Sequence, residues 1–183
     1  MADPYATRLL ADATARYPFV KFHNPMVTIG TGQDDYAETW PTGETGDKQY
    51  PRPANFPIDR IGIQVFRPQA FGANDLAAEM LHIDPYANST RDMLMRSLTP
   101  GQVATLKKQS GDYRQSVDMG LGEDKAMSNA IDSAMRGYTV GQWPQSANDA
   151  MQYNPQQRQM LDSLKSYMTT GVYPSSFDLA ITR

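Results

Sequence analysis

The first 73 residues combine one helical stretch with several short extended stretches. Apolar residues over 4–16 recur at the three- and four-residue spacing of a helix, which Asp3 can cap and Pro4 can begin. Prolines recur from residue 18 to residue 68 and exclude long helices there. Strand-like runs cover residues 26–29, 36–40 and 61–66. They predict a small antiparallel sheet of two or three strands, with the turn-rich stretch 41–57 as an exposed loop.

From residue 74 onward the apolar spacing is helical almost throughout. Thr99-Pro100-Gly101-Gln102 is the clearest helix start, because Thr99 and Gln102 can bond each other's backbone amides in a capping box. A similar signal recurs at Asn154-Pro155-Gln156-Gln157. Three further helices are predicted: one from Asn74 that stops before Pro85, one that begins at Ser89 or Thr90, and one over 123–136 that Gly137 closes. Residues 146–153 predict a helical turn.

These elements predict an α+β fold that is mainly helical, with a small two- to three-stranded antiparallel sheet in the N-terminal half. A chain of 183 residues fits a single domain. Within it we expect a helix, sheet and loop over residues 1–73, a helical part over 74–170 and an irregular tail over 171–183.

The composition excludes several classes of protein and of site. With a net charge of −3 and no cluster of lysines and arginines, the chain lacks the basic surface of a nucleic-acid-binding domain. It has no cysteine, which excludes disulfides, thiolate nucleophiles and cysteine-based zinc sites. No apolar run approaches the roughly 20 residues of a membrane span, and the N-terminus lacks a signal-peptide pattern. We therefore expect a soluble protein with neither nucleic acid nor membrane as partner.

Glu79 and His82 lie in the only segment that resembles a catalytic motif. A zinc-peptidase helix places histidine, glutamate and a second histidine at positions i, i+1 and i+4, but here Ala78 stands where the first histidine belongs. A zinc site would therefore need His82, His23 and a carboxylate, with Glu79 activating the bound water. Two other interpretations stay open: a zincin-like helix that has lost its metal, and a simple surface pair one helical turn apart. We expect no cofactor, with zinc as the alternative.

A second segment, Arg136 to Pro144, is rich in the residue types that dominate protein interfaces. Arg136, Tyr138 and Trp143 follow one another closely near a predicted helix end. They are therefore candidate interaction residues. The alternative is that Trp143 fills the core where helices meet, and we favour that interpretation for this side chain.

The order of several short motifs resembles that of uncharacterised proteins and protein segments encoded by tailed bacteriophages. The motifs lie between residues 36 and 168: Trp40-Pro41-Thr42-Gly43-Glu44, Pro51-Arg52-Pro53, the run 61–66, Ser97-Leu98-Thr99-Pro100-Gly101-Gln102, Arg136-Gly137-Tyr138 and Tyr153-Asn154-Pro155-Gln156-Gln157. The resemblance implies a virion component or an accessory protein, located in the virion or the host cytoplasm. It supplies no catalytic residues.

We therefore expect a non-enzymatic phage protein that acts through protein–protein contacts. Its partner would be another virion protein or a host protein, and homo-oligomerisation stays an open alternative. Its helix-rich core would derive from a zincin. The rival hypothesis is a zincin-like, metal-dependent hydrolase or peptidase that uses Glu79 and His82.

Overall fold

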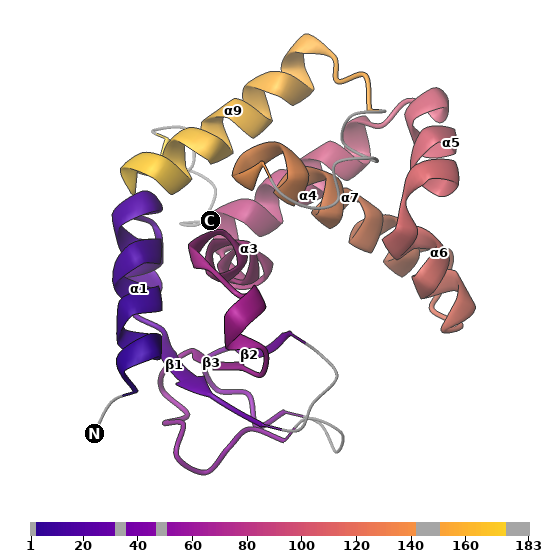
Figure 1. Ribbon diagram of the computed structural model, residues 1–183. Coiled ribbons are helices and arrows are strands. Elements are labelled where there is room, and N and C mark those ends of the chain that lie inside the picture. Colours follow the sequence, from indigo (N-terminus) through magenta and orange to yellow (C-terminus); the bar gives the residue numbers. More distant parts are fainter. Residues whose placement is uncertain (1–2, 32–35, 47–50, 142–150, 175–183) are drawn as a thin grey trace. The chain divides into compact units, whose positions relative to one another are not determined.

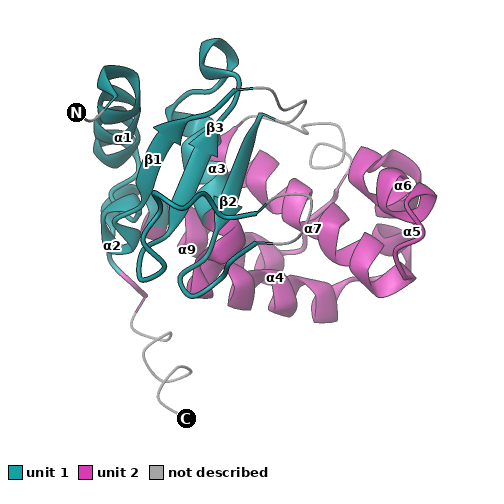
Figure 2. Ribbon diagram, turned by 90° about the horizontal axis from the view of Figure 1, so that it is seen from below, with its two compact units in different colours: residues 1–80, 168–172 teal, residues 81–167, 173–183 magenta. Residues whose placement is uncertain are grey.

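The computed structural model describes residues 3–31, 36–46, 51–141 and 151–174 (Figure 1). The chain divides into two compact units, which are described separately (Figure 2). Unit 1 comprises residues 1–80 and 168–172, and unit 2 comprises residues 81–167 and 173–183. In the described residues, no helix has the length and apolarity needed to cross a membrane.

Unit 1 contains a helix, a small sheet and the first part of a second long helix. Its elements are α1 (Pro4–Arg16), α2 (Val20–His23), β1 (Met26–Ile29), β2 (Ala37–Trp40), β3 (Gly62–Val65), a 3-10 turn η1 (Pro68–Ala70), the N-terminal part of α3 (Ala73–Ile83) and the last residues of α9 (Pro155–Thr170). The predicted cap of the first helix is confirmed, since the Asp3 carboxylate accepts hydrogen bonds from the amides of Tyr5 and Ala6.

The sheet has three strands in the order β1-β3-β2 and is mixed rather than purely antiparallel. β2 pairs antiparallel with β3, as predicted, but β1 pairs parallel with it, with Met26 opposite Gly62. The chain reverses direction after β1 and again after β2. After these two reversals β3 runs in the same direction as β1. Since β3 also lies between β1 and β2, it pairs parallel with β1, which the long connection between them permits.

The Arg52 side chain connects several parts of the described 41–57 loop. The Arg52 guanidinium donates from Nη1 to the carbonyls of Pro41, at 2.9 Å, and Glu44, at 3.1 Å. Beneath this loop, the rings of Trp40 and Phe56 pack with their centroids 5.6 Å apart. Both rings are buried, so this loop carries part of the core of unit 1.

Unit 2 is helical in its described residues. It holds the end of α3, then α4 (Pro85–Ser97), α5 (Pro100–Gln109), α6 (Gly111–Asp118), α7 (Glu123–Val140) and most of α9 (Pro155–Thr170). α7 is the central helix, since it contacts α4, α5 and α6 (Figure 1).

The methionines behave largely as core residues: Met80 and Met168 of unit 1 and Met135 of unit 2 are fully buried, whereas Met93 and Met119 of unit 2 are exposed. The mainly helical α+β fold is thus confirmed.

Two predicted helix boundaries in unit 2 are wrong. Pro85 does not simply stop a helix but begins α4, because Asp84 caps it by accepting a hydrogen bond from the Ala87 amide at 2.9 Å. Gly137 does not close α7, which continues to Val140 and ends at Gly141, whose φ of 66° suits a helix C-terminus. Gly137 is instead buried inside the helix. The predicted turn at 146–153 lies mostly outside the described residues.

Candidate functional site

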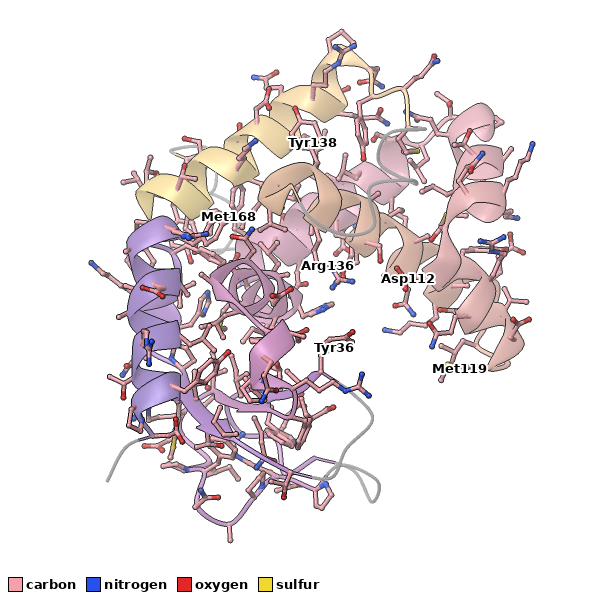
Figure 3. All side chains as sticks on the ribbon, in the orientation of Figure 1. Tyr36, Asp112, Met119, Arg136, Tyr138 and Met168 are labelled. Atoms are coloured by element: carbon pink, nitrogen blue, oxygen red, sulfur yellow. The ribbon has the colours of Figure 1, made fainter. Side chains whose placement is uncertain are left out.

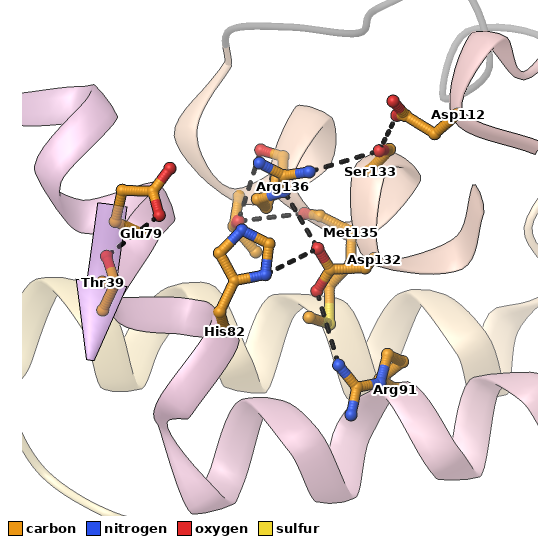
Figure 4. A network of polar contacts seen from close by, with 10 residues as sticks. Thr39, Glu79, His82, Arg91, Asp112, Asp132, Ser133, Met135 and Arg136 are labelled. Carbon is orange, nitrogen blue, oxygen red and sulfur yellow. Dashed lines mark hydrogen bonds and ion pairs between the residues drawn. The ribbon is translucent and has the colours of Figure 1, made fainter. Parts of the chain in front are cut away.

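A buried carboxylate in unit 2, Asp132, is surrounded by three basic side chains (Figure 4). Its Oδ2 atom lies 3.2 Å from His82 Nδ1 and 3.1 Å from Arg136 Nε. Its Oδ1 atom lies 3.7 Å from Arg91 Nη1. The Asp132 side chain is only 6% exposed. A carboxylate this deeply buried requires positive neighbours to remain charged.

Three helices supply this Asp132 cluster, which consists of Asp132, His82, Arg91 and Arg136. Asp132 and Arg136 lie one turn apart on α7, so their side chains point to the same side of that helix. Arg91 comes from α4, which packs against α7, and His82 comes from the last turn of α3. Packing between helices therefore brings together charges from distant parts of the sequence.

The polar contacts continue from the cluster to α6. The Ser133 hydroxyl donates to the Asp112 carboxylate and accepts from Arg136 Nη2 at 3.3 Å (Figure 4). One turn away, the Asn129 amide donates to the Ser116 hydroxyl at 2.9 Å. These bonds fix α6 against α7 and set the spacing of the polar groups between them.

The cluster forms one wall of a cavity of about 590 Å³. All its lining residues belong to unit 2: His82, Asn88, Arg91, Asp112, Gln115, Ser116, Met119, Leu121, Lys125, Asn129, Asp132, Ser133 and Arg136. Such a volume is typical of small-ligand sites, which occupy roughly 300–1,000 Å³. Most of the lining is polar, so the cavity suits a polar ligand.

Several polar atoms of the cluster have no hydrogen-bond partner among the described residues. They are the Nε atoms of Arg91 and Arg136 and the Oδ1 atom of Asp132. The ion pairs around Asp132 therefore have the right charges but incomplete hydrogen bonding. Buried groups in this condition favour binding of water or of a ligand that completes them.

The structure gives Glu79 and His82 different partners. Glu79 Oε2 accepts a hydrogen bond from the Thr39 hydroxyl at 3.2 Å in unit 1, whereas His82 pairs with Asp132 in unit 2. His23 belongs to α2 of unit 1, where its ring meets the edge of Phe19 at 6.2 Å between centroids. No three potential ligands of the His, Cys, Asp and Glu types gather into a metal-binding group in the described parts of the chain. The zinc-hydrolase hypothesis stays a prediction.

The two candidate interaction residues that the structure describes, Arg136 and Tyr138, have different surroundings. Arg136 belongs to the Asp132 cluster. The Tyr138 hydroxyl donates to Asp162 Oδ1 at 2.7 Å, and its ring meets Tyr153 edge to face at 5.7 Å. The hydrogen bond to the Asp162 carboxylate, followed by burial, raises the pKa of Tyr138. Trp143 lies outside the described residues. Their role in an interface stays a prediction.

Sequence patterns missed the central residue of the site, Asp132. A local signal was present, because Asp132 interrupts the run of small and apolar residues that α7 buries, and Arg136 follows one turn later. No local pattern indicated that Arg91 pairs with Asp132, because the two residues are far apart in the sequence and only the packing of α4 on α7 brings them together. The Asp132 cluster is interpreted from its own residues, because no protein-family model, curated protein or solved structure matches this chain.

Proposed function

We propose that this chain is a non-enzymatic virion or accessory protein of a tailed bacteriophage, and that it acts by binding another protein. The order of motifs between residues 36 and 168 supports the phage setting. The contact surface we propose is the α6–α7 turn surface, formed by Val117, Met119 and Leu121 in unit 2.

The observation that carries the proposal is the exposure of these three apolar side chains. Val117 is 47% exposed, Met119 68% and Leu121 38%. Figure 3 shows Met119 at the end of α6. Single exposed apolar residues are ordinary, but three within five positions concentrate apolar area that a partner can cover. Methionine suits such a surface, because its flexible side chain adapts to the shape of its partner.

The surroundings of this turn resemble the edge of a protein interface. Asp118, Asp124 and Lys125 are exposed next to the three apolar residues along the chain. An apolar centre with a charged rim is the usual arrangement at a protein interface. Full burial of an exposed side chain such as Met or Leu contributes about 1.5–3 kcal/mol, and the part of each side chain that is still exposed here is what a partner can bury.

The motif itself favours binding over metal-dependent catalysis, because Ala78 stands where a zinc-peptidase helix has its first histidine. Glu79 is hydrogen-bonded to Thr39, and His82 is paired with Asp132. The contact with Asp132 uses His82 Nδ1 and is compatible with a metal on the other ring nitrogen, so the missing histidine, not these contacts, favours the proposal. For this reason the hydrolase remains the rival hypothesis rather than the proposal.

Affinity purification from phage-infected cells, followed by reconstitution with the purified partner, tests the proposal. We expect Met119→Asp to weaken the complex about tenfold or more, because a charge replaces an apolar anchor. Met93→Asp is the matched control, since Met93 is a second exposed methionine of unit 2. Equal binding by both variants, or failure to reconstitute any complex, would contradict the proposal. Mass spectrometry of purified virions then separates a virion component from an accessory protein.

A further inference from the structure

The cavity beside the Asp132 cluster carries an excess of positive charge. Three permanent cations line it, Arg91, Lys125 and Arg136, against the two carboxylates Asp112 and Asp132. The Asp112 carboxylate also accepts a hydrogen bond from the Ser133 hydroxyl, so part of its hydrogen-bonding capacity is already used.

Two of the cations are not saturated by the protein. Arg91 Nη1 lies 3.7 Å from Asp132 Oδ1, which is longer than a hydrogen bond, and Arg91 Nε has no acceptor within the described chain. The Arg91 side chain is 22% exposed. Lys125 is exposed and makes no ion pair with any residue that the structure describes. Both side chains therefore keep donors available to a ligand in the cavity.

From this geometry we infer that the cavity binds an oxyanion, the phosphate or carboxylate group of a small ligand. A guanidinium offers two parallel donors to such a group, and Arg91 has the weakest tie to the protein. Lys125 contributes a mobile positive charge. Asp132 acts as a positioning residue, because its ion pairs with Arg136 and His82 hold them beside the cavity. Met119 and Leu121 of the α6–α7 turn surface also line this cavity, but binding of an anion rests on the cations and does not depend on the proposed protein contact.

Nuclear magnetic resonance of the arginine Nε–Hε groups tests the inference directly. The full-length chain is titrated near neutral pH with inorganic phosphate and, separately, with acetate, at constant ionic strength. We expect saturable shifts of the Arg91 and Arg136 signals, and no saturable shift of Arg67, which stacks on Tyr36 in unit 1. Tighter binding of phosphate assigns the ligand group to phosphates, and tighter binding of acetate assigns it to carboxylates.

Single substitutions distinguish specific binding of the anion in the cavity from non-specific electrostatic attraction to the protein. Arg91→Gln should weaken binding of the tighter anion about tenfold or more. Lys125→Gln changes an exposed residue, so the fold should be retained. This variant should weaken binding of the same anion about twofold to fivefold. Lys108→Gln, at an exposed position on α5, is the control and should leave binding unchanged. Shifts that never saturate, equal shifts at Arg67, or unchanged affinity in the Lys125 variant would overturn the inference.

Discussion

Gln102 and Gln157 exchange two hydrogen bonds between their side-chain amides. Gln102 Nε2 donates to Gln157 Oε1 at 2.7 Å, and Gln157 Nε2 donates back to Gln102 Oε1 at 3.1 Å. Each glutamine also closes the capping box of its own helix, with Thr99 at the start of α5 and with Asn154 at the start of α9. Two helix starts of unit 2 are thereby joined through one buried polar pair.

This pair predicts strong coupling between two positions that are distant in sequence. Gln157→Ala should lower the free energy of unfolding by about 1–3 kcal/mol, because the buried Gln102 amide loses its bonds with Gln157 and keeps only the Gln152 carbonyl as acceptor for Nε2. Gln102→Ala should have a similar effect, and the double variant should cost less than the two single effects together, by about 0.5–3 kcal/mol. Urea unfolding followed by circular dichroism measures all three variants. Gln156→Ala, at an exposed neighbour, is the control, and simple additivity would refute the coupling.

The Asp132 cluster predicts that removing one buried charge lowers the free energy of unfolding strongly. Asp132→Asn keeps the shape of the side chain but leaves Arg136 and Arg91 without their buried counter-charge. We expect the free energy of unfolding to fall by about 3–5 kcal/mol. Glu123→Gln, which breaks the exposed ion pair with Lys107, should cause no measurable change. Similar stability of both variants would show that the cluster does not stabilise unit 2.

Tyr167 predicts a dependence of stability on alkaline pH. Burial, followed by hydrogen bonding with Tyr173 and Asp84, raises its pKa above that of a free tyrosine. The unfolded chain therefore ionises first, near pH 10, so this contribution to stability is complete below about pH 10 and is lost as the pH rises further. Tyr167→Phe removes the donor to Asp84 Oδ2, at 2.8 Å, and should destabilise the protein by about 1–3 kcal/mol below that pH.

The difference between the unaltered chain and Tyr167→Phe should then narrow above about pH 10. Unfolding free energies measured from about pH 8 to about pH 11 check this expectation. A difference that stays constant across the whole range would contradict the assigned pH dependence.

Zinc content separates the proposed binding protein from the rival hydrolase. Protein purified without chelators should contain far less than one zinc per chain, and His82→Ala should not change that content. The expected reason is that Ala78 stands where the first histidine of a zinc-peptidase helix belongs, which leaves that helix with His82 as its one imidazole ligand. Elemental analysis of both proteins measures the metal. Stoichiometric zinc that disappears in His82→Ala would establish the rival hypothesis instead.

Local chemistry made much of the fold predictable. The Asp3 cap, the Thr99–Gln102 capping box and the apolar run of β1 each depend on residues within a few positions, and all three are confirmed. The wrong start of α4 also had a local signal, because Asp84-Pro85 repeats the Asp3-Pro4 pattern that begins α1. Proline can both end one helix and begin the next, and Pro85 does both, whereas the sequence prediction used it only as the end of a helix.

Features that depend on distant residues were not predictable in this way. The parallel pairing of β1 arises because its neighbour in the sheet is β3 rather than β2, an order that no run of residues encodes. Glu79 and His82 lie one turn apart in sequence, yet the chain around them supplies each with a separate partner. The Asp132 cluster likewise joins residues from α3, α4 and α7, so its chemistry emerges only from helix packing.

Site-specific photo-crosslinking at position 119 tests the proposed protein contact most directly. A photo-reactive residue in place of Met119 is compared with the same residue at Gln159, an exposed position on α9 of the same unit. During infection, position 119 should give a crosslink to one protein, identifiable by mass spectrometry, and position 159 should give none. Crosslinks of equal yield at both positions, or none at position 119, would contradict a protein contact at the α6–α7 turn surface.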